Sequence, residues 1–235
     1  MTELIYTLIM THITIICVTL FLHRGQAHKG IVFNPILSHA MRAWLWATTG
    51  MVTKQWVAIH RKHHRFSDKQ GDPHSPHVYG IWSVLFRGAM LYHTASKDAA
   101  MVQQYGVGTP DDWMERNVYT KHSRLGIMLM VLINVLLFGA GGLIIWGVQM
   151  IWIPFWAAGV VNGLGHWIGY RNGKTKDHSR NIMPWGIIIG GECLHNGHHM
   201  DPANPKLSRR WFEFDIGWMY LIIFELLGLV KINRR

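Results

Sequence analysis

The sequence predicts an all-α integral membrane protein, a bundle of three to four transmembrane helices beneath a cytosolic helical cap with a histidine-rich site. Composition is the first reason: 49% of the 235 residues are apolar and only 15% are charged, against roughly 25% in soluble domains. Charge placement is the second, because residues 125–170 contain no Lys, Arg, Asp or Glu. The 12 tryptophans suit the membrane interface, where their amphipathic rings gather.

Three segments are long and apolar enough for spans of about 20 residues. Residues 3–22 form the first; they lack the basic region and cleavage site of a signal peptide, which indicates a retained helix. The charge-free stretch divides into 126–148 and 150–170, a hairpin that turns near Gly147. Residues 31–58 are also apolar, but Arg42 lies among them. Because a charge at mid-bilayer costs at least about 2.5–3.5 kcal/mol, we expect this segment at the interface or packed on the protein.

The positive charge is confined to two segments. Of the 23 Lys and Arg residues, 13 lie in 23–124 and 10 in 171–235. The positive-inside rule places both segments on the cytosolic side, so the net charge of +10 reflects topology. It does not indicate nucleic-acid binding, because no compact basic and aromatic module is present. No linker divides the chain, and residues 1–235 are predicted to form a single domain.

Histidine is abundant, with 16 residues, and much of it is clustered. Two triplets share the spacing H-x-x-H-H: His60, His63 and His64, and His195, His198 and His199. Positions i, i+3 and i+4 share a helix face, so each triplet is predicted to aim three imidazoles at one point. Two such turns facing each other could hold two metal ions. His23 and His28 are five residues apart, which suits a helix end or contacts to two different metals.

One isolated histidine is also a candidate ligand. His166 lies at the end of the charge-free stretch, and Asn162 precedes it by one helical turn on the same face. Polar residues at membrane depth are costly and usually functional. His74 and His77, in the loop "DPHSPH", are weaker candidates, and the remaining single histidines are interpreted as structural or solvated.

The types of candidate ligand narrow the choice of metal and of reaction. Zinc hydrolases of the H-E-x-x-H type need a glutamate that neither triplet has, and structural zinc sites favour cysteine, of which there are two. Soluble di-iron bundles use glutamates, whereas neutral imidazoles suit iron, copper or zinc. A nitrogen-rich two-metal site facing a membrane indicates oxygen chemistry on an apolar substrate.

Several motifs resemble those of one family. "HRGQAH", "HRKHH" and "HNGHH" resemble the three histidine boxes of membrane fatty acyl desaturases of the delta-9 acyl-CoA or acyl-lipid type, and "GDPH", "GGECLHNGHH" and "WFEFDIGWMY" extend the likeness along most of the chain. The resemblance implies two iron ions held by nine histidines, with Asn162 holding a metal-bound water and Trp56 and Trp156 near the acyl tunnel. The implied ligands are His23, His28, His60, His63, His64, His166, His195, His198 and His199.

The resemblance also implies the reaction, the O2-dependent removal of two hydrogens from a saturated acyl chain to give a cis double bond. The acyl chain would arrive on CoA, a carrier protein or a phospholipid. The sequence lacks HPGG, CxxC and G-x-G-x-x-G motifs, so we expect no bound haem, flavin or nicotinamide. Electrons would come from an external ferredoxin or cytochrome b5-like carrier with its reductase, and the basic cytosolic face would steer an acidic carrier. The short termini suggest the bacterial inner membrane, with the endoplasmic reticulum as the alternative.

Two departures from the family pattern and two other functions bear on this interpretation. Only one clear crossing precedes His23, and Gln55 stands where an acid often precedes the tryptophan.

A related di-iron hydroxylase acting on an acyl chain, sterol, carotenoid or alkane would carry similar boxes and differ in its product. A membrane metal-binding or transport protein would place ionisable residues within the spans, where the hairpin has only His166.

Overall fold

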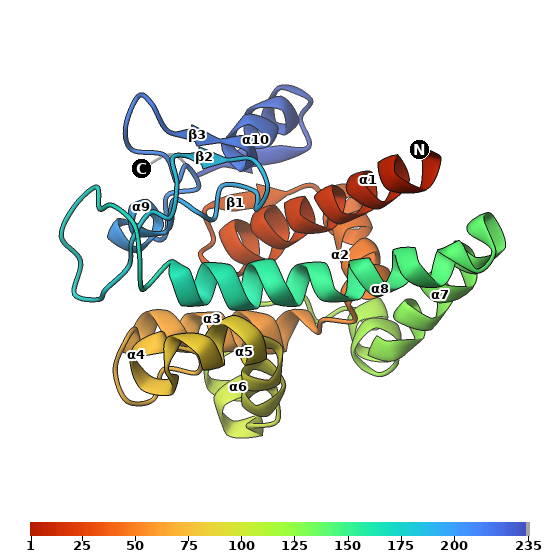
Figure 1. Ribbon diagram of the computed structural model, residues 1–235, viewed down its shortest axis with the longest axis horizontal. Helices are drawn as coiled ribbons and strands as arrows, with labels where there is room; N and C mark the ends of the chain where they lie inside the picture. Colours follow the sequence, from red (N-terminus) through yellow and green to blue (C-terminus); the bar gives the residue numbers. More distant parts are fainter. Residues whose placement is uncertain (234–235) are drawn as a thin grey trace.

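Two long helices form the axis of the fold (Figure 1). In the computed structural model, which describes residues 1–233, Thr2–Cys17 (α1) continues into the π-helical segment Val18–Ala27 (η1). Likewise Gly141–Ile153 (α8) continues into the π-helical Pro154–Leu164 (η3). By length and composition, these two continuous helices, Thr2–Ala27 and Gly141–Leu164, are candidates to cross a membrane. They lie alongside each other, with α1 packed on α8.

The predicted hairpin forms, but its turn lies elsewhere. Ser123–Phe138 (α7) ends at Gly139, which has a φ of +56°, and α8 begins two residues later. The prediction of a turn near Gly147 is therefore wrong, because that residue lies inside α8. Two local constraints explain the difference. A positive φ disfavours residues with a side chain, and a Cβ on Gly142 would lie 2.2 Å from the carbonyl oxygen of Asn134.

The apolar segment after the first helix packs on the protein, as expected. Pro35–Thr49 (α2) begins where the Asn34 side chain accepts a hydrogen bond from the Leu37 amide, and it packs against α1 and α7. Arg42 is buried, and its guanidinium lies 2.6 Å from Asp112 and 3.2 Å from Glu115. A buried cation needs such partners, which explains how Arg42 is tolerated in an apolar helix.

The cap is built from shorter helices. Thr53–Phe66 (α3) packs against η1 and Ala99–Tyr105 (α6), and Ile81–Ser96 (α5) packs along η3. The other helices are Pro76–Tyr79 (α4), Glu115–Thr120 (η2), His195–Met200 (α9) and Ile216–Leu226 (α10).

The described chain is mostly helical, as predicted, and four short strands also link segments of the cap. Ile31–Phe33 (β1) pairs antiparallel with Val230–Ile232 (β4), and Trp185–Gly186 (β2) pairs parallel with Phe214–Asp215 (β3). These pairs satisfy backbone groups of segments that would otherwise be irregular. Strands of two or three residues are too short to show a period in the sequence, which is why they were missed.

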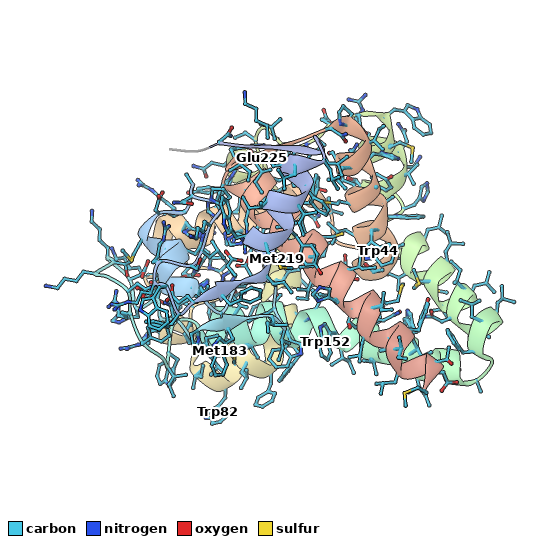
Figure 2. The ribbon with its side chains drawn as sticks, turned by 90° about the horizontal axis from the view of Figure 1, so that it is seen from above. Trp44, Trp82, Trp152, Met183, Met219 and Glu225 are labelled. Atoms are coloured by element: carbon cyan, nitrogen blue, oxygen red, sulfur yellow. The ribbon has the colours of Figure 1, made fainter. Side chains whose placement is uncertain are left out.

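The core surrounds η1, where Leu20, Phe21 and Leu22 are buried. The opposite end of the fold is apolar on its outside: Leu4 and Leu8 of α1, Leu136 of α7 and Ile144 of α8 are exposed. Nitrogen-bearing side chains instead gather around α9 and the neighbouring loops (Figure 2). The exposed apolar surface of α1, α7 and α8 is consistent with membrane association.

Candidate metal centre

The nine predicted histidines come together from four segments of the chain. They are supplied by the end of η1, by α3, by the turn after η3 and by α9. Within each of two groups, the nearest ring nitrogens all lie within 4.8 Å of one another. The first group is His23, His28, His60, His64 and His198, and the second group is His63, His166, His195 and His199.

Each H-x-x-H-H triplet is divided between the two groups, so the prediction that a triplet aims at one point is wrong. His60 and His64 belong to the first group and His63 to the second; on α9, His195 and His199 belong to the second group and His198 to the first. With 3.6 residues per turn, positions i and i+4 lie on one edge of a helix, whereas i+3 lies about 100° from i+4. Two facing turns with this spacing therefore complete two sites together.

The pair in the first box shows why the winding of η1 matters. On an α-helix, residues five apart point in different directions, but η1 is wound so that the His28 amide donates to the His23 carbonyl at 3.2 Å. The two imidazoles consequently meet edge to face, with ring centroids 5.0 Å apart. Of the two predicted alternatives, the helix end is correct, since His28 caps η1 and both rings belong to the first group. Such π-helical turns occur often at functional sites.

The ring nitrogens are spaced as metal ligands would be. In the first group the Nε2 atoms lie 2.8 Å apart between His28 and His60, 3.0 Å between His60 and His64, and 2.9 Å between His64 and His198. Two nitrogens bound at right angles to one metal at about 2.0–2.1 Å would lie about 3 Å apart. A neutral imidazole has one N–H, so the Nε2 atoms of His60 and His64, which each have two of these neighbours, cannot satisfy both by hydrogen bonding alone.

In the second group, unpaired nitrogens support the same interpretation. The Nε2 atoms of His63 and His199 are buried and have no hydrogen-bond partner among the described residues. The Nε2 atoms of His166 and His195 lie 2.9 Å apart. Buried polar atoms normally find partners, and a cation among these nitrogens would provide one. The residues present therefore fit two metal ions.

Four carboxylates orient four of the imidazoles, and sequence reasoning missed them. The Nδ1 atoms of His23, His63, His166 and His199 lie 2.8–2.9 Å from one carboxylate each. The carboxylates belong, respectively, to Glu192, Asp72, Asp68 and Asp177. Donation from Nδ1–H leaves the Nε2 lone pair free for a metal. The available signal in the sequence was the closeness of these four acids to the histidine boxes, in a chain with only 13 acids.

Burial keeps most of these imidazoles neutral. It lowers the pKa of His28, His60, His64, His195 and His198 well below the ordinary value, and that of His199 to about 3. His63 differs: burial alone would lower its pKa, but the Asp72 carboxylate raises it. Because a metal needs the unprotonated ring, the low pKa values favour metal binding near neutral pH.

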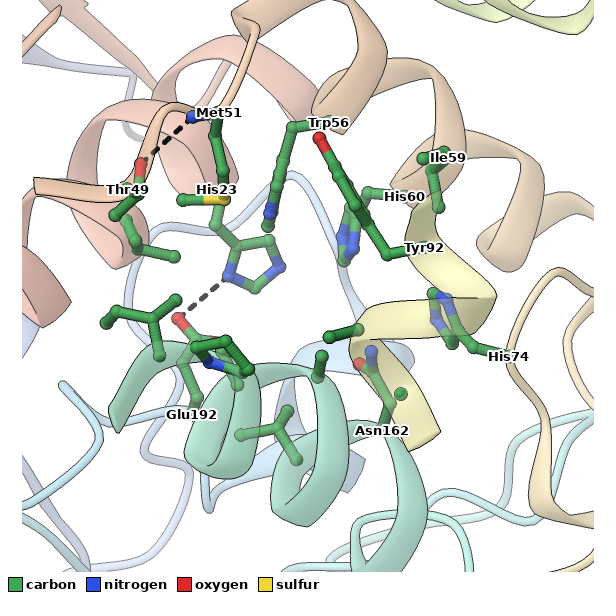
Figure 3. A pocket seen from close by; sticks show the side chains of 18 of the residues that line it. His23, Thr49, Met51, Trp56, Ile59, His60, His74, Tyr92, Asn162 and Glu192 are labelled. Carbon is green, nitrogen blue, oxygen red and sulfur yellow. Dashed lines mark hydrogen bonds and ion pairs between the residues drawn. The ribbon is translucent and has the colours of Figure 1, made fainter. Parts of the chain in front are cut away.

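A cavity of about 220 Å³ lies against both groups (Figure 3). His23 and His60 of the first group and His195 of the second line it, together with Asn162 and Trp56, which stacks on His60 at 5.0 Å between ring centroids. Most of the other lining residues are apolar. Among them are Val18, Met51, Ile59, Met150, Ile153, Ala157 and Val161.

Trp156 does not line this cavity among the residues that the structure describes, although we expected it near the acyl tunnel. Ala157 and Val161 of η3 face the cavity, whereas Trp156 lies beside Trp152, with ring centroids 5.7 Å apart, and packs on the core. His74 also lines the cavity and stacks on His63 at 4.5 Å between ring centroids, whereas His77 is exposed and contacts His178 with its ring tilted.

Comparison with known proteins decides the family. The family model for fatty acid desaturases matches residues 2–220. The chain belongs to the fatty acid desaturase family. The family resemblance predicted from the histidine boxes is thereby confirmed.

Similar members of the desaturase family are acyl-lipid enzymes by name. The chain is 32% identical over 181 residues to the sn-1 stearoyl-lipid 9-desaturase of Synechocystis sp., a match covering 75% of the chain and 54% of the relative. It is 30% identical over 224 residues to the Delta-9 acyl-lipid desaturase 1 of Arabidopsis thaliana, covering 90% and 68%. The match to the sn-1 stearoyl-lipid 9-desaturase of Anabaena variabilis has 31% identity and covers 74% and 62%. The chain thus spans little more than half of the Synechocystis relative.

Proposed function

We propose that this chain is an O2-dependent fatty acyl desaturase that introduces a cis double bond into a saturated acyl chain. The observation that carries the proposal is the contact of one mainly apolar cavity with both histidine groups. In the overall reaction, O2, two electrons and two protons, together with two hydrogens removed from adjacent acyl carbons, give the double bond and two waters. An apolar chain lying in this cavity would present its methylene groups to both groups at once.

The nine histidines are proposed to hold two iron ions, five imidazoles at one and four at the other. When bound, the irons would supply the activation of O2. Asn162, which lines the cavity one turn before His166, is proposed to hold a water beside the second group. The carboxylates of Glu192, Asp68, Asp72 and Asp177 would hold their imidazoles in one tautomer and orientation.

The cavity residues position the substrate. The apolar side chains exclude water from the acyl chain, and Trp56 fixes the His60 ring by stacking on it. Because the named relatives act on acyl lipids, we propose an acyl lipid as the substrate, with acyl-CoA and acyl carrier protein as the alternatives. An external ferredoxin or cytochrome b5-like carrier, with its reductase, is proposed to deliver the two electrons.

We propose that residues 1–235 act as a single membrane domain in which Thr2–Ala27, Ser123–Phe138 and Gly141–Leu164 cross the bilayer. The histidine groups would then lie on the cytosolic side, since the segments 23–124 and 171–235 carry all the Lys and Arg residues. The bacterial inner membrane remains a prediction.

The function is tested by expressing the full chain in a host that lacks unsaturated-chain synthesis and analysing its fatty acids by mass spectrometry. A new monounsaturated chain, absent with the His64→Ala variant, is the expected result. A hydroxylated chain without an alkene would instead assign the protein to the related hydroxylases.

A further inference from the structure

Three polar side chains form a hydrogen-bonded row between the helices at the apolar end of the fold. The Tyr6 hydroxyl of α1 donates to Oδ1 of Asn134 on α7 at 2.9 Å, and Nδ2 of Asn134 donates to Oε1 of Gln149 on α8 at 3.0 Å. Asn134 is fully buried, and Gln149 is 5% exposed. Because polar side chains at membrane depth are costly and usually functional, we expect this row to have a role.

The row ends at an unpaired donor beside the cavity. Gln149 lines the cavity, and its Oε1 atom accepts from Asn134. Its Nε2 atom is buried and has no hydrogen-bond partner among the described residues. The Thr48 and Thr49 hydroxyls, which also line the cavity, donate to backbone carbonyl oxygens of α2 at 2.8 Å and 2.5 Å. A buried amide without a partner costs free energy, so Gln149 requires a partner from outside the chain.

Gln149 lies at the opposite end of the cavity from the histidine groups. Gln149 and Asn162 both line the cavity, and both belong to the continuous helix Gly141–Leu164. They are 13 residues apart in the sequence, which corresponds to up to about 20 Å along a helix axis. Asn162 lies one turn before His166 of the second histidine group, whereas Gln149 lies toward the turn between α7 and α8. The cavity therefore has a metal end and a membrane end.

An acyl lipid in this cavity would direct its methyl end toward Gln149. The ester and headgroup of a lipid are polar and belong on the side of the charged cap, whereas residues 125–170, which include Gln149, contain no Lys, Arg, Asp or Glu. The methyl end of the chain has no atom that accepts a hydrogen bond from Nε2. A chain that reached Gln149 would therefore displace water from the amide and leave it unpaired, whereas a shorter chain would leave that water in place.

We propose that the Gln149 amide holds a water molecule at the membrane end of the cavity and thereby limits the length of the acyl chain that binds. The proposal rests on the proposed function, which places a saturated acyl chain in this cavity. Water suits the site because it can accept from Gln149 and donate to the hydroxyl oxygens of Thr48 and Thr49, which lie on α2, a helix in contact with α8. Gln149 is thus a residue that determines specificity and takes no part in the chemistry.

Three variants separate the amide in the cavity from the packing of the helices. Gln149→Met removes the amide and nearly keeps the side-chain volume. Tyr6→Phe breaks the outer end of the same row and is the matched control, because Tyr6 does not line the cavity among the described residues. Gln149→Met also leaves Nδ2 of Asn134 unpaired. The triple variant Y6F/N134L/Q149M therefore replaces the whole row by apolar side chains of similar shape, a change that costs little stability when no partner stays unpaired.

The full chain is expressed in a host that lacks unsaturated-chain synthesis and is supplied with stearate and the longer behenate. Mass spectrometry measures the alkene fraction at each chain length. We expect the wild type to prefer stearate, and this preference to fall about tenfold in Q149M and in the triple variant, because behenate no longer leaves an amide unpaired. Y6F should keep the wild-type preference.

Three results would overturn the proposal. The first is a wild type without a preference for stearate over behenate. The second is an unchanged preference in either Q149M or the triple variant, measured in protein that inserts in the membrane and has the circular dichroism of the wild type. The third is an equal fall in Y6F, which would show that the preference follows helix packing rather than the amide in the cavity.

A binding measurement distinguishes failure of this proposal from failure of the proposed function. Displacement of cis-parinaric acid, a fluorescent fatty acid, from the purified full chain by stearate and by behenate reports on chain length without turnover. Relative to stearate, Q149M should bind behenate about tenfold more tightly than the wild type does. If the wild type forms no alkene, the desaturase function is wrong, and the displacement measurement still decides whether Gln149 limits chain length.

Discussion

His23 and His28 stack edge to face with ring centroids 5.0 Å apart, although they are five residues apart in the sequence. The π-helical winding of η1 makes this possible, because it aligns residues i and i+5. The proposed first metal position therefore depends on a local departure from α-helical geometry. Mutations in η1 can therefore test what maintains this π-helical winding.

Gly25 is the position in η1 where an added side chain would disturb that winding. A Cβ there would lie 2.5 Å from the Phe33 ring and 3.0 Å from the Leu20 carbonyl oxygen. We expect Gly25→Ala to destabilise the fold by about 1–3 kcal/mol and to lower iron retention, measured by thermal unfolding and metal analysis. Gly147→Ala is the control, since its Cβ would meet no atom within 4 Å. Full iron retention in Gly25→Ala would show that the winding tolerates a side chain.

Replacing a proposed metal ligand of the first group should stop product formation. His64→Ala and His198→Ala should abolish alkene formation while membrane insertion stays intact, because each removes an imidazole from the five-residue group. Fatty acid analysis and membrane fractionation measure the two properties. His93→Ala, at an exposed histidine, should keep normal activity. Wild-type turnover in either of the first two variants would remove that residue from the ligand set.

The orienting carboxylates predict an effect on metal affinity. In Asp177→Asn the side chain keeps its shape but the charged partner of His199 is lost, so iron affinity should fall by about 10–100-fold. Competition with a chelator measures this change. Asp111→Asn alters an acid paired with Arg116 on the surface, where both side chains are largely exposed, and should leave affinity unchanged. An equal effect in both variants would argue against the orienting role.

The hydrogen-bond network beneath α9 predicts a dependence of stability on pH. Burial alone would raise the pKa of Glu213, but five hydrogen bonds to its carboxylate, from Arg209, Arg210, Tyr170, Asn172 and Asn181, hold it below the ordinary 4.5. A lowered folded pKa contributes stability above the unfolded value and loses it as the pH falls. Glu213→Gln should therefore be less stable than wild type at pH 6, measured by thermal unfolding. The difference in stability between the two proteins should narrow below pH 4.5. A difference that widens there would contradict the lowered pKa of Glu213.

Substitution of Asn162 should produce an intermediate effect. Its side chain lines the cavity but makes no hydrogen bond to a described residue, which suits a role in holding water. Asn162→Ala should lower the rate of product formation without abolishing it, and iron content should stay near the wild-type level. Complete loss of iron in this variant would instead make Asn162 part of the metal-binding set.

The sequence predicted which histidines gather, because their spacing and box motifs are local patterns. It did not predict that His63 would join the second group and His198 the first, since that depends on how α3 and α9 face each other. The winding of η1 likewise depends on packing around Gly25, and the turn at Gly139 depends on the close approach of Gly142 to Asn134. The supporting carboxylates, including Glu192, were missed because a single acid near a motif gives no periodic signal.

The two histidine groups are proposed to hold two metal ions side by side, one in each group, and the proposed function depends on this pair. Metal analysis of the purified full chain tests the pair most directly, with His64→Ala representing the first group and His199→Ala the second. We predict two irons per chain in the wild type and about one in each variant. A wild type that binds one iron, or none, or variants that each keep both irons, would contradict this arrangement.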